Sequence, residues 1–199
     1  MIYKVDETFL SVQGEGFWVG TPMVFVRLSG CNLNCEWCDT QQDAYCKMSD
    51  TEILERVRKL TESSTVERVC ITGGEPTLQD LHPLADALCD EFLLHLETNG
   101  TNRIDPDMDI SWITVSPKFP PGLGRTVQRW GNELKVPVWS GIMDRAIEGC
   151  STWGHFTHRY LQPVDNAELV ANAERCLALA CKDSSWSISM QGHKRLGIK

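Results

Sequence analysis

Apolar residues run together or alternate with polar ones in a series of short segments, which is the pattern of β-strands. The clearest of these strands are predicted at residues 23–28, 66–72, 92–97, 110–115, 132–136 and 158–163. Weaker alternation over residues 2–12 and 185–190 predicts two further extended segments.

Helical spacing of apolar residues is clear in only three places, residues 50–62, 78–91 and 166–181. Ser49 and Glu52 have the spacing of a capping box at the start of the first helix. Pro83 interrupts the second helix near its beginning. The segments 98–110 and 137–157 hold too many Gly, Pro and Trp residues for regular crossover helices.

Six strands with few helices between them predict an α/β fold, an open and partial barrel smaller than the eight-unit form. A chain of 199 residues with 42 % apolar residues is expected to form one domain over 1–199. Chemistry in such folds is found at the carboxyl ends of the strands, so polar residues there are the candidate site.

Composition indicates the compartment and the class of substrate to expect for this domain. The sequence contains no run of eighteen apolar residues, so no transmembrane helix is predicted. The first residues lack the basic and then apolar order of a signal peptide. Nine cysteines without an export signal favour reduced thiols in the cytoplasm. The net charge of −8 disfavours a nucleic-acid surface, so we expect a small-molecule substrate.

Three cysteines lie within eight residues in Cys31-Asn-Leu-Asn-Cys35-Glu-Trp-Cys38, directly after the predicted strand 23–28. Thiolates at this spacing bind zinc or an iron–sulfur cluster, and both usually take four ligands. The other six cysteines are far apart in sequence, so a fourth ligand from the protein is not evident. The spacing therefore favours a centre with one open position, with a zinc site or grouped core thiols as alternatives.

Two glycine-rich segments are further candidates for binding a ligand. Gly73-Gly-Glu-Pro76 ends the strand 66–72, and Gln13-Gly-Glu-Gly16 follows the strand 2–12. Glycines let the backbone approach a ligand closely, although either segment could be an ordinary turn. Arg27 lies inside an apolar strand, where it requires an anion from a ligand or from a structural salt bridge.

The cysteine spacing, with Trp37 just before the last cysteine, resembles the radical S-adenosylmethionine (SAM) superfamily. The resemblance implies that Cys31, Cys35 and Cys38 hold a [4Fe-4S] cluster, whose fourth iron binds SAM. The Gly73-Gly-Glu75 segment resembles the one that holds the methionyl amino group in that superfamily. A glycyl-radical-enzyme activase is a rival within the superfamily, and a zinc-stabilised binding module is a rival of another class.

The segment Glu7–Gly16, together with Arg27, the Cys38-Asp-Thr40 triplet, Ser116-Pro-Lys118 and Gln191-Gly-His193-Lys, resembles the 7-carboxy-7-deazaguanine synthase family. That family converts 6-carboxy-5,6,7,8-tetrahydropterin to 7-carboxy-7-deazaguanine with loss of ammonia, in queuosine-type 7-deazapurine biosynthesis. The resemblance implies hydrogen abstraction by a 5′-deoxyadenosyl radical and ring contraction. It further implies a requirement for Mg²⁺, a homodimer, and a flavodoxin- or ferredoxin-type electron donor.

The resemblance also implies roles for individual residues. The pterin pocket would comprise Val12, Gln13, Gly14, Glu15, Arg27, Thr72 and His193. SAM would be lined by Trp37, Cys38, Asp39, Gly73, Gly74, Glu75, Ser116, Pro117, Lys118, Tyr160, Leu161, Gln162 and Pro163. Thr40 would bind Mg²⁺, although a loop threonine often bonds its own backbone. His193 could equally be an exposed residue, and Cys46 is expected to be no ligand.

Overall fold

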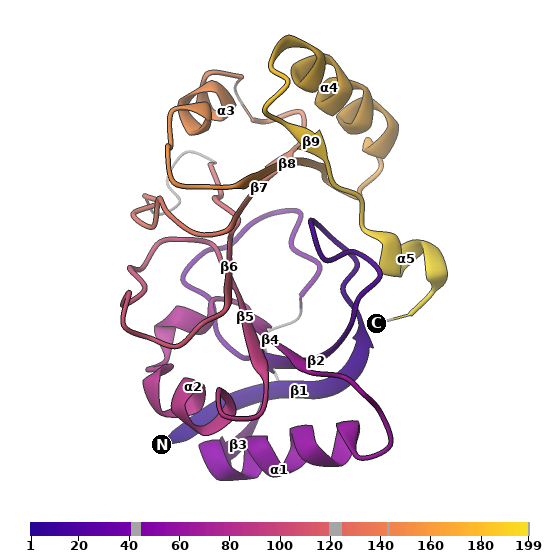
Figure 1. The fold of residues 1–199 in the computed structure, drawn as a ribbon. Helices are drawn as coiled ribbons and strands as arrows, with labels where there is room; N and C mark the ends of the chain where they lie inside the picture. The colour runs from indigo at the N-terminus through magenta and orange to yellow at the C-terminus, as the bar shows by residue number, and fades with distance from the viewer. Residues whose placement is uncertain (41–44, 120–124, 143, 199) are drawn as a thin grey trace.

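The computed structural model describes residues 1–40, 45–119, 125–142 and 144–198 and contains one sheet (Figure 1). Within these ranges the sheet has nine strands in the order β3-β1-β2-β4-β5-β6-β7-β8-β9. The strands are β1 (Ile2–Val12), β2 (Pro22–Leu28), β3 (Cys46–Ser49), β4 (Arg68–Gly73), β5 (Leu93–Thr98), β6 (Trp112–Val115), β7 (Glu133–Val138), β8 (His158–Pro163) and β9 (Ser187–Ile188). From β2 to β9 all neighbouring strands are parallel, and β1 is antiparallel to both β2 and β3.

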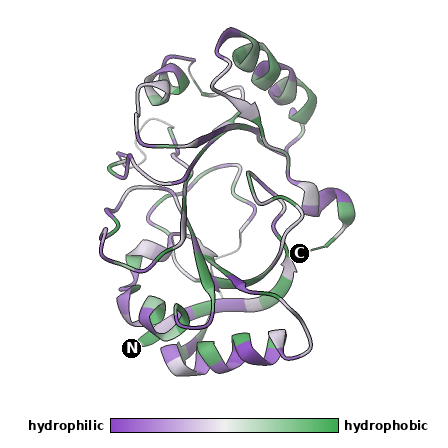
Figure 2. Ribbon diagram, in the orientation of Figure 1, coloured by the Kyte–Doolittle hydropathy of each residue, from purple (hydrophilic) through white to green (hydrophobic). Residues whose placement is uncertain are grey.

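Most of the helices lie outside the curve of the sheet, and the last one lies at its open side, near the C-terminus (Figure 1). They are α1 (Asp50–Thr61), α2 (His82–Leu88), α3 (Asp144–Ser151), α4 (Leu169–Lys182) and α5 (Gly192–Leu196), with a short 3₁₀ turn, η1, at Pro76–Leu78. In Figure 2, α1 and α4 carry both hydrophobic and hydrophilic segments, as expected of helices with one face against a sheet. None of the helices in the described ranges combines the length and apolar character that crossing a membrane requires.

The two faces of the sheet differ in chemistry because successive side chains of a strand point to opposite faces. One face carries buried apolar residues such as Val26, Ile71 and Leu134, which pack with residues of the helices in the main core. The other, which we call the inner face, carries a smaller apolar cluster around Met23, Phe25 and Cys70 and, further along the strands, polar residues.

All six strongly predicted strands are present as β2 and β4–β8, and the α/β class with a mostly parallel sheet is confirmed. The predicted capping box is also present, since the Ser49 side chain accepts from the Glu52 amide and the Glu52 carboxylate accepts from the Ser49 amide. The extended segments at 2–12 and 185–190 add β1 and β9 to the sheet.

Three elements were not predicted, namely β3, α3 and α5. The strand β3 is only four residues long and is defined by pairing with β1, which a local pattern cannot reveal. The helix α3 lies inside the segment 137–157, where helix was not expected, because an eight-residue element fits between the Gly and Trp residues. The predicted helix 78–91 is shorter, since Pro83 fits the first turn of α2 and not its interior. The segment 119–124 holds Pro and Gly residues that predict a loop, and all of it except Phe119 lies outside the described residues.

Candidate active site

The register of the parallel strands gathers polar side chains at one end of the inner face. Arg27 on β2 lies opposite Thr72 on β4, and Lys135 on β7 lies opposite Tyr160 on β8. Glu97 on β5 shares this face, because it is opposite Thr114, which is in turn opposite Glu133. Arg27, Thr72 and Glu97 are each next to the last residue of their strands, where the sequence predicted the site, whereas Lys135 lies in the middle of β7 and Glu133 begins it.

A cavity of about 640 Å³ opens at this end of the sheet. All seven residues predicted for a substrate pocket line it, namely Val12, Gln13, Gly14, Glu15, Arg27, Thr72 and His193. It is also lined by the three grouped cysteines and by Trp37, Asp39, Thr40, Gly73, Gly74, Ser116, Lys118 and Gln162. The structure thus brings most of the predicted residues of three separate motifs into one cavity.

Five predicted residues do not line this cavity: Glu75, Pro117, Tyr160, Leu161 and Pro163. Leu161 is fully buried in the main core, on the face opposite Gln162. The Glu75 carboxylate is buried and accepts from the Thr98 hydroxyl at 2.7 Å and from the Asn99 amide at 2.6 Å. In this structure Glu75 therefore fastens the segment that follows β5.

The cysteine loop, residues 31–38, forms one side of the cavity. Burial raises the pKa of the Cys31 and Cys35 thiols, while Cys38 is exposed. Across the described ranges, no three His, Cys, Asp or Glu side chains are close enough to share a single metal ion. A cubane cluster takes each thiolate at a different iron, so its ligands stand further apart than those of one ion. Three cysteines around a common cavity therefore fit a cluster better than they fit zinc.

Lys118 and Trp37 lie beside this loop. The Lys118 ammonium is 5.5 Å from the centre of the Trp37 ring and donates to the Ser116 hydroxyl at 2.6 Å. Burial, together with the positive charge of Lys135, lowers the pKa of Lys118. Trp139 also packs beside Trp37, with the two ring centres 5.3 Å apart.

Lys135 lies at the centre of a buried cluster of charges. Its Nζ is 2.5 Å from Glu15 Oε2 and 3.3 Å from Glu97 Oε1. The Lys135 side chain is 4 % exposed, against 14 % for Glu15 and 23 % for Glu97. Two amides complete the cluster, since Gln13 Nε2 donates to Glu97 Oε1 at 2.9 Å and Gln191 Nε2 donates to Glu15 Oε1 at 2.7 Å.

The three charges of this cluster stabilise one another. Burial by itself raises the pKa of Glu15, but the Lys135 ammonium outweighs burial and lowers that pKa to about 2. The pKa of Glu97 is also lowered by Lys135 against the effect of burial. Burial opposes the charge of Lys135 as well, yet the surrounding carboxylates raise its pKa. All three groups are therefore charged at neutral pH.

The C-terminal segment forms another wall of the cavity. The Gly192 amide donates to the Gly14 carbonyl at 2.8 Å, and the His193 ring lies so close to Gly14 that a Cβ there would be 1.8 Å from Nδ1. Lys194 Nζ is 2.6 Å from Asp39 Oδ2, which joins this wall to the cysteine loop. His193 is thus part of the cavity and not a fully exposed residue.

Arg27 has the structural salt bridge that was one of the two alternatives considered from the sequence, and its position leaves the ligand alternative open. Its Nε donates to Glu7 Oε1 at 3.1 Å, so it has a structural partner, and the residue also lines the cavity. A guanidinium fork has five N–H donors, more than a single carboxylate contact requires.

Sequence reasoning did not single out Lys135, Glu97 or Gln191. The sequence around Lys135 does indicate a strand with one polar face, since residues 133–138 alternate charged or Pro positions with Leu134, Val136 and Val138. A charged residue at every second position of a central strand indicates a polar inner face, by the argument applied to Arg27. Gln191 belongs to the Gln191-Gly-His193-Lys segment of the resemblance, but its contact with Glu15 was not predicted, because the two residues are 176 positions apart in sequence.

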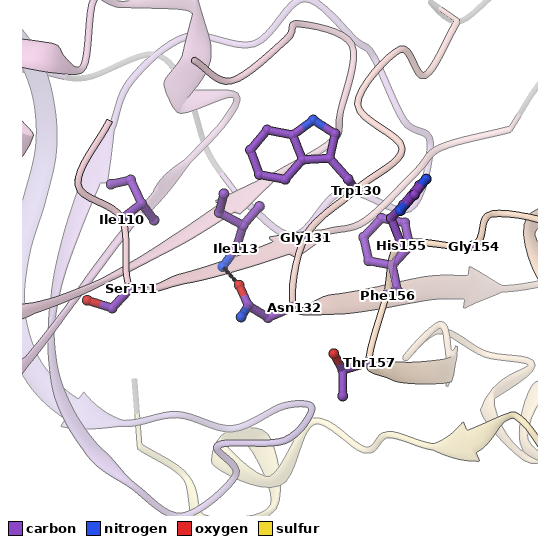
Figure 3. A pocket seen from close by; sticks show the side chains of 10 residues that line it. All are labelled: Ile110, Ser111, Ile113, Trp130, Gly131, Asn132, Gly154, His155, Phe156 and Thr157. Carbon is purple, nitrogen blue, oxygen red and sulfur yellow. Dashed lines mark hydrogen bonds between the residues drawn. The ribbon is translucent and has the colours of Figure 1, made fainter. Parts of the chain in front are cut away.

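A second cavity of about 560 Å³ lies at the amino ends of β6, β7 and β8 (Figure 3). It contains none of the predicted site residues. Its most polar lining residue is Asn132, whose Oδ1 accepts from the Ile113 amide at 2.8 Å, the dashed bond in Figure 3. That side chain continues the pairing of β6 and β7 and serves the fold.

Comparison with known proteins defines the class first. Residues 25–113, which hold the cysteine loop and Gly73-Gly-Glu75, match the family model of the radical SAM superfamily. The match places the three cysteines and the glycine pair within the part of the chain that is common to this class of enzymes.

Full-length relatives are more specific. The chain is 37 % identical to 7-carboxy-7-deazaguanine synthase of Bacteroides thetaiotaomicron and 33 % identical to that of Escherichia coli, with all of both chains covered in each case. The crystal structure of QueE from Escherichia coli superposes with a TM-score of 0.80 at 30 % identity, covering 97 % of this chain and 95 % of that one. The chain belongs to the 7-carboxy-7-deazaguanine synthase family.

Proposed function

We propose that this chain converts 6-carboxy-5,6,7,8-tetrahydropterin to 7-carboxy-7-deazaguanine with release of ammonia. The observation that carries the proposal is the single cavity shared by the cysteine loop, the Gly73-Gly74 pair and the Gln13–Glu15 loop. Membership of the family supports it, and so does the fold, which we interpret as the partial barrel of radical SAM enzymes. The whole chain would act as one domain, with substrate-binding segments near both termini.

Cys31, Cys35 and Cys38 are the residues that would hold a [4Fe-4S] cluster, and the donor set fits it. When bound, the cluster and SAM supply the radical chemistry of this class of enzyme. Trp37, Asp39, Gly73, Gly74 and the polar groups at the ends of β6 and β8 would line SAM. Lys118 and Ser116 bond each other there, so that part of the wall is already ordered.

The pterin would bind between the Gln13–Glu15 loop and Arg27. An amino-pyrimidinone edge presents N–H donors, which suit the Glu15 carboxylate, held in its charged form by Lys135. Arg27 and His193 would bind oxygens of the substrate, and Thr72 lies beside Arg27 on the next strand. Thr40 would be the protein's ligand to Mg²⁺, a hard ion that takes oxygen donors and keeps several waters.

Assembly, location and electron supply extend the same proposal. We expect a homodimer that receives electrons from a flavodoxin- or ferredoxin-type protein. All nine cysteines are free in the structure, which supports a reducing compartment, and we place the enzyme in the cytoplasm.

The direct test is an anaerobic assay of the iron-reconstituted protein with SAM and the pterin, in which the product is identified by mass spectrometry. We expect 7-carboxy-7-deazaguanine and ammonia in equal amounts. Cleavage of SAM without this product would favour another radical SAM activity, such as a glycyl-radical-enzyme activase. Zinc at one ion per chain without sulfide would favour a binding module.

Arg27→Ala is expected to lower kcat/KM for the pterin by roughly 10–100-fold, because a hydrogen bond to a charged group contributes roughly 1.5–3 kcal/mol. Iron content and SAM binding should be unchanged, since Arg27 pairs with Glu7 and lies opposite Thr72, and is neither one of the three cysteines nor part of the glycine pair. Arg68→Ala is a matched control, because Arg68 packs 3.8 Å from the Trp18 ring centre and does not line the cavity. Loss of iron from the Arg27 variant would show that the residue is misplaced in this proposal.

A further inference from the structure

The strand β7 holds the Gln13–Gly16 loop at two points. Glu133 and Lys135 are two residues apart, so both project from the inner face of β7. The Lys135 ammonium contacts Glu15 at 2.5 Å, and Glu133 Oε2 accepts from the Phe17 amide at 3.1 Å. Both β7 side chains are buried, with 2 % and 3 % of the residue exposed.

Gly16 lies directly against the Glu133 carboxylate. A Cβ at Gly16 would be 2.0 Å from Glu133 Oε1, and φ at Gly16 is +65°, a conformation that favours glycine. The Gly16 amide donates to the Ser189 hydroxyl at 2.9 Å, so the loop is fixed from the C-terminal side as well. The loop therefore packs against Glu133 at Gly16, the second glycine of the Gln13-Gly-Glu-Gly16 segment.

We propose that Glu133 is a positioning residue, whose carboxylate holds the Gly16–Phe17 backbone so that Gln13, Gly14 and Glu15 keep the geometry for binding the pterin. The inference rests on the function proposed above for the Gln13–Glu15 loop. Glu133 itself does not line the cavity and acts through the loop.

The charged and titratable groups that face Glu133 come from four elements. They are Lys135 on its own strand, Glu15 in the loop, Glu97 on β5 and Tyr160 on β8, with His158 opposite in the register of β8. Burial raises the pKa of Glu133 to about 7, although Lys135 and the Phe17 amide oppose that rise. A raised carboxyl pKa means that the folded state holds a proton that the unfolded state releases, so this group makes stability fall as pH rises from about 4.5 to about 7.

Ionised Glu133 accepts the Phe17 amide more strongly than the protonated acid does. We therefore expect KM for the pterin to decrease as pH rises through about 7 in the natural protein. Glu133→Gln retains an oxygen acceptor but cannot ionise, so it should keep KM within about threefold at neutral pH and lose this pH dependence. Glu133→Ala should raise KM about tenfold with kcat within about twofold, the loss expected for one charge-assisted hydrogen bond.

Thr114→Val is the matched control for packing. Thr114 is buried on the same face and bonds His95 at 2.9 Å and Trp112 at 3.2 Å, and neither of these bonds reaches the Gln13–Gly16 backbone. We expect it to lower the melting temperature without changing KM. A Glu133→Ala variant with unchanged KM, or one in which kcat and SAM cleavage fall together with the melting temperature, would overturn the proposal.

Hydrogen exchange provides a readout that is independent of turnover. The Phe17 amide should exchange at least about tenfold faster in Glu133→Ala than in the natural protein and the Thr114→Val control. If the pterin is not converted by the natural protein, the proposed function fails while this exchange still tests the positioning role. Unchanged exchange at Phe17 would refute the positioning role even if the reaction is as proposed.

Discussion

Lys135→Met is expected to destabilise the protein by about 3–5 kcal/mol and to remove turnover of the pterin, because it leaves two buried carboxylates without their cation. Glu15 and Glu97 both depend on the Lys135 ammonium for their charge, since burial alone raises their pKa. Methionine has a similar volume to the lysine stem, so the loss would come from charge and not from a cavity. Urea denaturation and the anaerobic assay measure the two effects.

The pH dependence of this variant has a definite sign. In the natural protein the folded-state pKa of Glu15 is about 2, below its ordinary 4.5, so its stabilising contribution is present above pH 4.5 and is lost between about 4.5 and 2. Without Lys135 the pKa rises above 4.5, so the variant should recover stability relative to the natural protein as pH falls from 7 to about 4.5.

Arg58→Met is the control for an exposed ion pair. Arg58 pairs with Glu91 at the surface, where the two side chains are 53 % and 41 % exposed, and such pairs contribute about 0–1 kcal/mol. Equal destabilisation by both variants would show that Lys135 and its carboxylates do not form the stabilising cluster described above.

Replacing any one of Cys31, Cys35 and Cys38 by alanine is expected to remove the bound iron and sulfide and to lower SAM cleavage to background. In the proposed site the three thiolates are the whole ligand set of the protein, so none is in reserve. Iron and sulfide analysis after anaerobic reconstitution, together with the visible absorbance, measures the loss directly.

Cys46→Ala and Cys181→Ala are matched controls, because both thiols are exposed like that of Cys38 but do not line the cavity. Both should retain the iron and the activity. In the structure the Cys46 thiol donates to the Val5 carbonyl at 3.4 Å. Iron loss in the Cys46 variant would mean that it supplies a fourth ligand and closes the centre.

Short-range pattern was enough to predict the strands that build the sheet. Strands β2 and β4–β8 are apolar on the helix-covered face, and that repeat is visible in the sequence. Two short elements were not predicted. The strand β3 is defined by its pairing with β1, and the helix α5, with only five residues, is too short to show a helical repeat. The cysteine and glycine motifs were recognisable because each is contiguous and follows a strand.

The electrostatic cluster of the site was not predictable in the same way. Glu15, Glu97 and Lys135 belong to a loop and two strands, and only the register of the sheet places them together. Arg27 was recognised as a charge inside an apolar strand, and the same argument applied to Lys135 would have found it. What the sequence did not contain was the identity of its partners.

We expect the C-terminal wall of the cavity and the cysteine loop to form at different stages of folding. The thiols that would take iron lie within eight neighbouring residues and need only a local turn. The bonds from Gly16 to Ser189 and from Glu15 to Gln191, in contrast, span 173 and 176 positions, and we expect contacts of such long separation to form late in folding. We therefore expect a nascent or partly refolded molecule to be able to take up iron before it can recognise its substrate.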